Sequence, residues 1–188
     1  MGHGIFTGDW SRLENAGKIA LGNFYLDENR SFFGGVLQGI SRSTWELPQN
    51  TLGYSYSQIR NTFGKVDDVR YFGGATFAIN EHSPKRNGIS FSNYINVNIR
   101  QELQVNDPQG WMYSEDGLFC RKYRHTFQSE RFGLSYLFGV GMPSILTAKS
   151  DNHDFEWYEP QANRWAWRYA NKHGFMNNWL YPNDKPLR

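Results

Sequence analysis

Residues 117–131, GLFCRKYRHTFQSER, have the length and the spacing of one helix. Phe119, Tyr123 and Phe127 recur every four residues, so they would share one stripe of that helix and face a core. His125 lies at the edge of this stripe. The pattern predicts a central helix on which the other segments pack.

Four positions separate Arg121 from His125, so both side chains would point to the same side of the helix. The same spacing occurs in the motif H-E-x-x-H, in which two histidines bind zinc and the glutamate acts as a general base beside the metal-bound water. Here the five positions read Arg-Lys-Tyr-Arg-His, so only the last zinc ligand of that motif is present.

Length and composition indicate a folded protein. With 188 residues, of which 39% are hydrophobic and 17% aromatic, the chain is expected to form one domain, residues 1–188. The net charge of +2 is too small to indicate nucleic-acid binding by itself. The single cysteine, Cys120, excludes an internal disulfide, and no apolar run is long enough to cross a membrane. The first ten residues, MGHGIFTGDW, lack the charged and apolar regions of a signal peptide, so we expect any export signal to lie elsewhere or on another protein.

Apolar periodicity predicts helices in four places. The predicted ranges are 9–26, 45–63, 117–131 and 159–172. Gly64 would end the second helix, and Pro160 suits the first turn of the last. Residues 30–40 are rich in glycine, and we expect them to be irregular. Residues 134–148 should form a strand or loop and then a short helix that starts near Pro143.

The strand signals lie between the second and third predicted helices. Residues 69–79 (VRYFGGATFAI) are aromatic and β-branched around a glycine pair, which indicates strand, bend and strand. Residues 80–88 are polar and predict a loop. Residues 89–99 alternate between two faces, which predicts one strand with one face on a core. Together these segments indicate an α+β domain.

Several blocks of this sequence, in order, resemble a toxin-type domain of Bacteroidota found at the C-terminal ends of polymorphic and Rhs-like secreted proteins. Members of that family carry H-E-Y-G-H followed by T-x-Q-S, G-x-P-S and W-x-E-x-x-A-N. Here the last three blocks read TFQS at 126–129, GMPS at 141–144 and WYEPQAN at 157–163. The resemblance extends to residues 44–80 (TWELPQN to TFAIN) and 88–96 (GISFSNYIN), so it covers nearly the whole chain.

The resemblance implies a zincin-like metallopeptidase fold. In it a small antiparallel sheet packs against the zinc-binding helix, and a second, C-terminal helix supplies the third ligand. Residues 1–65 would then be a mainly helical N-terminal part, and residues 66–188 the zincin-like core. His125 matches the second histidine of the motif, and Glu159, 34 residues later, matches the glutamate of a His-His-Glu site. Asn163, one turn after Glu159, would orient a ligand by hydrogen bonding.

The same resemblance implies an activity and partners. The domain would be an antibacterial effector, secreted or delivered into a target bacterial cell as part of a larger protein. Its partner would be a cognate immunity protein, and its cofactor would be zinc.

Three departures from the motif bear directly on its chemistry. Arg121 stands in place of the first histidine, Lys122 in place of the catalytic glutamate, and Arg124 in place of the glycine. A guanidinium stays protonated and cannot bind zinc, and a charged lysine cannot accept a proton from water. We therefore expect impaired metallopeptidase chemistry and no bound zinc. The guanidinium of Arg121 would instead form an ion pair with Glu159 that joins the two helices.

Other side chains could act at the same place. His153 could complete a residual metal site with His125 and Glu159, although a polar loop that caps the following helix is the interpretation we favour. Cys120 could be a nucleophile, but its position five residues from His125 favours a buried structural role. Ser129 could also be a nucleophile, and we expect instead a surface or capping residue.

Three functional classes remain open. The first, which we favour, is an effector with a metallopeptidase-like fold and a disabled zinc centre. The second is a pseudoenzyme that binds an immunity protein or another protein. The third is a metal-independent nuclease-type toxin that uses His125, Glu159 and the arginines. For the basic run within residues 121–131, a solvated helix face is a better explanation than nucleic-acid binding.

Overall fold

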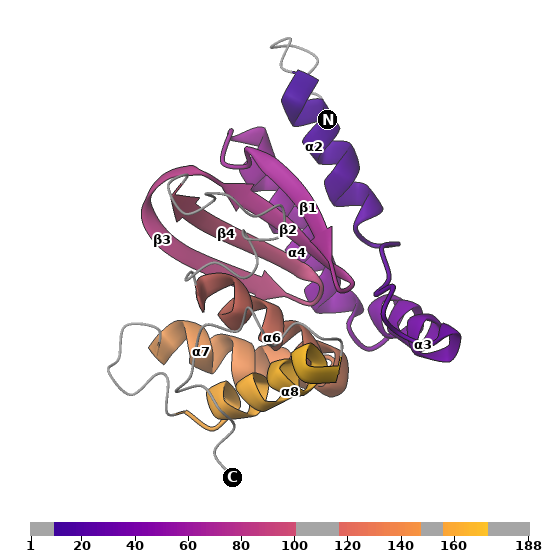
Figure 1. The fold of residues 1–188 in the computed structure, drawn as a ribbon. Helices are drawn as coiled ribbons and strands as arrows, with labels where there is room; N and C mark the ends of the chain where they lie inside the picture. Colours follow the sequence, from indigo (N-terminus) through magenta and orange to yellow (C-terminus); the bar gives the residue numbers. More distant parts are fainter. Residues whose placement is uncertain (1–9, 101–116, 148–155, 173–188) are drawn as a thin grey trace.

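The structure, a computed structural model, describes residues 10–100, 117–147 and 156–172, which form helices around a four-stranded sheet (Figure 1). The helices are α2 (Trp10–Leu21), α3 (Phe32–Ser43), α4 (Leu47–Thr62), α6 (Gly117–Phe132), the π-helix η2 (Leu137–Gly141), α7 (Met142–Thr147) and α8 (Tyr158–Lys172). The strands are β1 (Asp68–Phe72), β2 (Ala75–Asn80), β3 (His82–Phe91) and β4 (Tyr94–Arg100). The predicted α+β class is confirmed. None of the described helices is both long and apolar enough to span a membrane.

The four helices predicted from apolar periodicity are present as α2, α4, α6 and α8. The segment after α6 differs from its prediction. Residues 137–141 form a π-helix instead of a strand or loop, and the short helix α7 follows at Met142. This segment therefore continues the helical path beyond the central helix.

The sheet is mixed, whereas the sequence led us to expect an antiparallel one. Its strand order is β1-β2-β4-β3, with β2 and β4 parallel and the other two pairs antiparallel. The chain leaves β2 for the edge strand β3 and then returns as β4 between them, which gives β4 the direction of β2. The β1–β2 turn uses Gly73 and Gly74, both with positive φ (53° and 79°), as the predicted bend requires.

Two predictions for the segment 80–99 were wrong. The polar residues 82–88 belong to strand β3, in which His82, Asn87 and Gly88 pair with β4 and the register shifts between His82 and Asn87. The alternating stretch 89–99 is two strands rather than one, since Ser92 and Asn93 form a turn between Phe91 and Tyr94. Ser92 has φ of 51° and is buried, with its hydroxyl bonded to Glu46. The hydrogen bond from Ser92 to Glu46 therefore stabilises a turn that the alternating sequence pattern did not predict.

The glycine-rich segment 30–40, expected to be irregular, lies mostly within helix α3. Ser31 caps this helix by accepting a hydrogen bond from the Gly34 amide. Gln38 accepts from the Asp27 amide (2.8 Å), and the buried Arg42 donates to the carbonyls of residues 23, 25 and 74. These tertiary contacts offset the helix-weakening effect of glycine, about 0.5–1 kcal/mol per residue.

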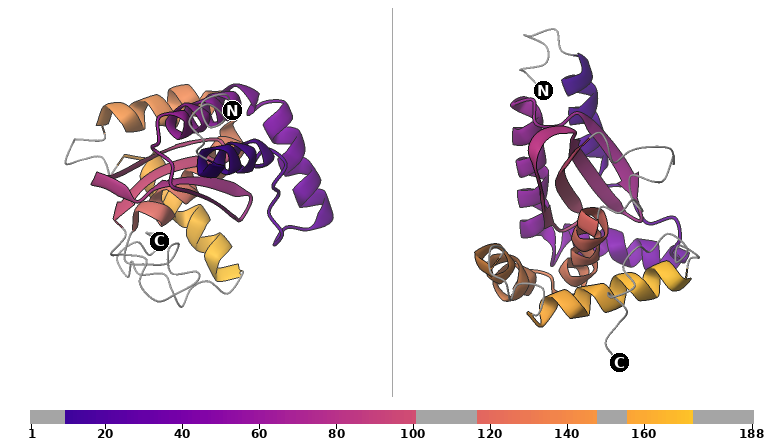
Figure 2. Two further views of the ribbon diagram at one scale, coloured as in Figure 1. Left: turned by 90° about the horizontal axis from the view of Figure 1, so that it is seen from above. Right: turned by 60° about the vertical axis from the view of Figure 1, so that its left-hand side comes forward.

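The sheet has an apolar cluster on each face. One cluster joins Phe77, Ile95 and Val97 of the sheet to Tyr123 of α6, with Phe127 and the α8 residue Tyr169 packed against it. The other joins Val69, Ala78 and Tyr94 to Ile19 of α2, with Tyr54 of α4 packed against it. The view from above in Figure 2 accordingly shows α4 and α8 on opposite sides of the sheet.

Candidate functional site

The central helix α6 and the first turn of α8 meet in a buried polar cluster. Arg124 and His125 come from α6, and Glu159 comes from α8. The Arg124 guanidinium donates to Glu159 Oε2, and His125 Nε2 lies 3.4 Å from Glu159 Oε1. All three side chains are at most 4% exposed. The structure therefore brings together His125 and Glu159, the two positions that the resemblance assigns to a metal site.

The imidazole of His125 is engaged on both sides. Its Nδ1 lies 2.8 Å from Oε1 of Gln128, and Gln128 in turn donates to the Tyr158 carbonyl (2.7 Å) at the start of α8. Burial lowers the pKa of His125, and the contact with Glu159 opposes this effect only in part. This shift favours the neutral imidazole, which has one N–H and can donate to Gln128 or to Glu159 but not to both.

The arginine found on Glu159 is Arg124, at the position that is glycine in the family motif. Arg124 was expected on a solvated helix face, and that prediction was wrong because α8 covers it. The ion pair predicted for Arg121 remains a prediction, because its side chain lies outside the described part of the structure. The same holds for the side chain of Asn163 and for all of His153.

The described residues do not fit a zinc ion. Structural and catalytic zinc sites use three or four nitrogen, sulfur or oxygen ligands from the protein. Among the residues that the structure describes, no group of three or more His, Cys, Asp or Glu side chains is arranged to hold a metal. One carboxylate oxygen of Glu159 is also occupied by the Arg124 guanidinium, which repels a dication.

A cavity of about 300 Å³ lies beside His125. Its walls come from α4, the β3–β4 pair, α6 and the η2–α7 segment. Lys122, the residue in place of the catalytic glutamate, contributes to the wall together with the buried Tyr136. Burial raises the pKa of Tyr136, and a hydrogen bond with Ser90 opposes that rise. The Tyr136 side chain is therefore a neutral phenol over the whole physiological pH range.

A second buried carboxylate was not found by sequence reasoning. Glu46 accepts hydrogen bonds from the hydroxyls of Ser41 (2.6 Å), Ser92 (2.9 Å) and Ser129 (2.8 Å). Ser129, expected at the surface or at a cap, is fully buried in this cluster and also accepts from Gln49. The prediction was wrong because the serine faces the start of α4 rather than solvent.

The sequence block TFQS did carry a signal for these contacts. Gln128 of that block orients His125, and Ser129 binds Glu46. In the block GMPS, Gly141 and Ser144 line the cavity beside His125. Residues of these two blocks therefore lie near His125 and Glu46.

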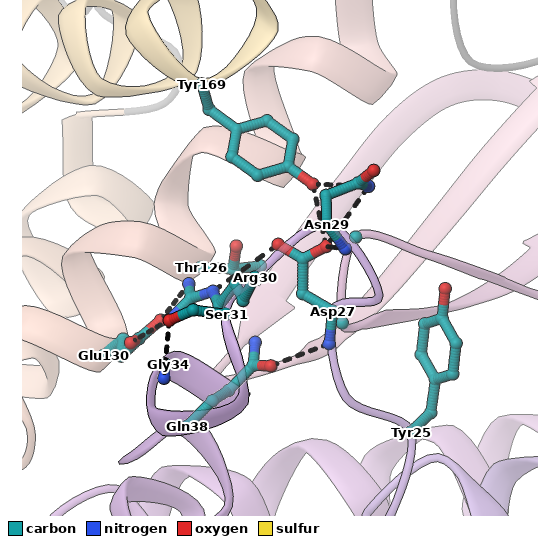
Figure 3. A network of polar contacts seen from close by, with 12 residues as sticks. Tyr25, Asp27, Asn29, Arg30, Ser31, Gly34, Gln38, Thr126, Glu130 and Tyr169 are labelled. Atoms are coloured by element: carbon teal, nitrogen blue, oxygen red, sulfur yellow. Dashed lines mark hydrogen bonds and ion pairs between the residues drawn. The ribbon is translucent and has the colours of Figure 1, made fainter. Parts of the chain in front are cut away.

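A further polar network connects α8 and α6 to the segment before α3 (Figure 3). Tyr169 donates to Asp27 Oδ1 (2.9 Å) and accepts from Asn29 (3.1 Å). Arg30 binds Glu130 through two parallel contacts of 2.5 and 2.6 Å. This network fixes the far end of α8, and so it helps to hold Glu159 at the near end against α6.

No protein-family model, curated protein or solved structure matches this chain.

Proposed function

We propose that this chain is a toxin-type effector domain, built like a zinc metallopeptidase, in which an ion pair has replaced the metal. The observation that carries the proposal is the Arg124 guanidinium on the Glu159 carboxylate, directly beside His125. The sequence blocks and the packing of α6 between the sheet and α8 also support it.

Elementary electrostatics explains how such a replacement can be tolerated. A buried carboxylate needs a cation or several hydrogen-bond donors, and a metal supplies the cation in a zinc centre. The guanidinium of Arg124 is permanently charged and can neutralise Glu159 without a metal. It cannot activate water, and Lys122 cannot act as a general base while charged. In this proposal the domain acts on its target by a route other than metal-assisted hydrolysis.

A second candidate is a binding module for an immunity protein or another protein. The supporting observation is the surface of α3, where Phe32 is 80% exposed, Phe33 77% and Leu37 58%. Leu37 also borders an open groove that contains Trp45 and Trp165. Large exposed apolar areas of this kind are typical of protein-binding surfaces. The nuclease-type alternative has no comparable support, because His125 is buried and its Nδ1 is bonded to Gln128.

Metal analysis tests the proposed replacement. Protein purified without chelators should contain far less than one zinc per chain. The triple variant Arg121→His, Lys122→Glu, Arg124→Gly restores the family motif and should bind about one zinc. Adding His125→Ala to the triple variant is the matched control and should abolish zinc binding. Stoichiometric zinc in the native chain that disappears in His125→Ala would contradict the proposal, as would a triple variant that folds and binds none.

Growth measurements test the effector part. The native chain is produced in the cytoplasm or, with an added export signal, in the periplasm of a bacterium that lacks an immunity protein. Growth arrest that persists in His125→Gln is expected for an effector that does not use metal-assisted hydrolysis. Normal growth in both compartments would contradict the effector proposal and favour the binding module.

A further inference from the structure

The charged side chains that line the cavity beside His125 are of one sign. Its wall contains the cationic residues Arg60 and Lys122, and the described residues that line it include no aspartate or glutamate. Its volume of about 300 Å³ lies at the small end of the range for ligand sites, about 300–1,000 Å³. These features favour a small ligand with a negative charge.

Arg60 is the cation with the clearest environment. Its guanidinium donates to the Lys65 carbonyl (3.2 Å) and to Asn98 Oδ1 (2.6 Å), and it lies 6.0 Å from the ring centre of Tyr56. These groups are neutral, and no carboxylate of the described residues forms an ion pair with Arg60. Partial burial lowers its pKa, and Tyr56 and the nearby Asp67 oppose this effect only in part. An anion in the cavity would add a counter-charge to that of Asp67.

The remaining wall includes apolar side chains, among them Ile89, Phe91 and Ile145. A ligand with a short carbon skeleton would contact them. We propose that this cavity binds a small organic anion whose acidic group pairs with Arg60 and whose carbon skeleton contacts the apolar wall. The anion is a phosphate ester or a carboxylic acid. This site does not depend on the effector function proposed above.

Titration calorimetry on the whole chain tests the proposal with four probes. Glycerol 3-phosphate represents the phosphate esters, and lactate represents the hydroxylated carboxylic acids. Glycerol is the neutral control, and inorganic phosphate is the control without a carbon skeleton. We expect saturable binding of at least one organic anion, no binding of glycerol, and weaker binding of inorganic phosphate. The organic anion that binds more tightly identifies the acidic group.

Two variants connect that binding to the cavity. Arg60→Gln should weaken the affinity about tenfold to a hundredfold, the usual effect of losing a hydrogen bond to a charged group. Arg168→Gln, on the exposed surface of α8, is the matched control and should leave the affinity unchanged. Ile145→Trp places a large ring at the partly exposed edge of the cavity and should block binding while circular dichroism stays native.

Several results would overturn the proposal. They are the absence of saturable binding for both organic anions, equal affinity in the native chain and Arg60→Gln, and unchanged binding in Ile145→Trp. Inorganic phosphate that binds as tightly as the organic anions would overturn the role given to the apolar wall.

Discussion

Arg124 carries a permanent charge into a buried site, where it pairs with the carboxylate of Glu159. Replacing one member of a buried ion pair leaves the other charge unpaired, which costs about 3–5 kcal/mol. We therefore expect Arg124→Met to lower the free energy of unfolding by about that amount. The double variant Arg124→Met, Glu159→Gln removes both charges and should recover a large part of the loss. Urea denaturation of the native chain and both variants measures the difference.

Arg168→Met, which changes an exposed arginine on α8, is the control for this comparison and should alter the unfolding free energy by less than about 0.5 kcal/mol. If the single and double variants at Arg124 are equally unstable, the ion pair does not determine the stability of this cluster.

The resemblance placed His125 and Glu159 at one site, and the sequence suggested Arg121, whose side chain lies outside the described residues, but not Arg124 as the partner of Glu159. Arg121 lies on the same helix face as His125. Arg124 lies about 100° from His125 around the helix axis. Which arginine reaches Glu159 depends on the angle at which α8 crosses α6. That angle is a property of the packed structure, and no local pattern in the sequence contains it.

Glu46 connects four elements through a single carboxylate. It lies at the start of α4 and binds Ser41 on α3, Ser92 in the β3–β4 turn and Ser129 on α6. Burial raises the pKa of Glu46, and the three serine hydroxyls oppose the rise. The folded state therefore holds a proton on Glu46 more tightly than the unfolded state does.

This shift has a definite sign for stability. Between the usual glutamate pKa of about 4.3 and the higher folded pKa, the folded state binds more protons, so the contribution of Glu46 to stability falls as pH rises. Above the folded pKa the contribution is constant. Glu46→Gln cannot titrate and keeps the shape of the side chain. The melting temperature of the native chain minus that of Glu46→Gln should therefore decrease from pH 4 upward and then level off.

Other carboxylates titrate in both proteins, and their contributions cancel in this difference. A difference that stays constant from pH 4 to pH 8, or that increases with pH, would contradict the raised pKa. Circular dichroism at each pH confirms that both proteins begin the melt folded.

Helices whose apolar residues recur at a regular spacing were predictable from the sequence, whereas elements stabilised by polar tertiary contacts were not. The helices α4, α6 and α8 begin and end near their predicted limits. Helix α3 was missed because Gln38 and Arg42 stabilise it through groups outside the helix. Strand β3 was missed over its polar half because its pairing with β4 through His82, Asn87 and Gly88 has no apolar alternation to mark it in the sequence.

For the whole molecule, the sequence indicated the α+β class but not the order of the strands. Antiparallel and mixed sheets can be built from the same alternating segments, and the choice depends on where β3 and β4 insert. The same limit applies to the cavity. Arg60 and Asn96 lie 36 positions apart in the sequence, on α4 and β4, and only the packing of α4 on the sheet brings both to one wall.

The network in Figure 3 gives the last prediction, because it joins parts of the chain that are far apart in sequence. Tyr169 on α8 and Asp27 before α3 are 142 positions apart, and the phenol donates to a carboxylate that is only 3% exposed. Tyr169→Phe leaves Asp27 with one donor fewer, so the free energy of unfolding should fall by about 1–3 kcal/mol. Tyr56→Phe is the control, because its hydroxyl has no hydrogen bond to the described residues and its loss should have little effect.

Hydrogen exchange separates a local effect from a global one. Since Tyr169 fixes one end of α8, the amides of α8 should exchange faster in Tyr169→Phe than in Tyr56→Phe, whereas those of β2 and β4 should change less. Faster exchange should also reach the first turn of α8, where Glu159 depends on the same packing to stay against Arg124. Equal acceleration in α8 and the central strands would mean that the contact stabilises only the fold as a whole. It would not then act as a link between α8 and the helices before the sheet.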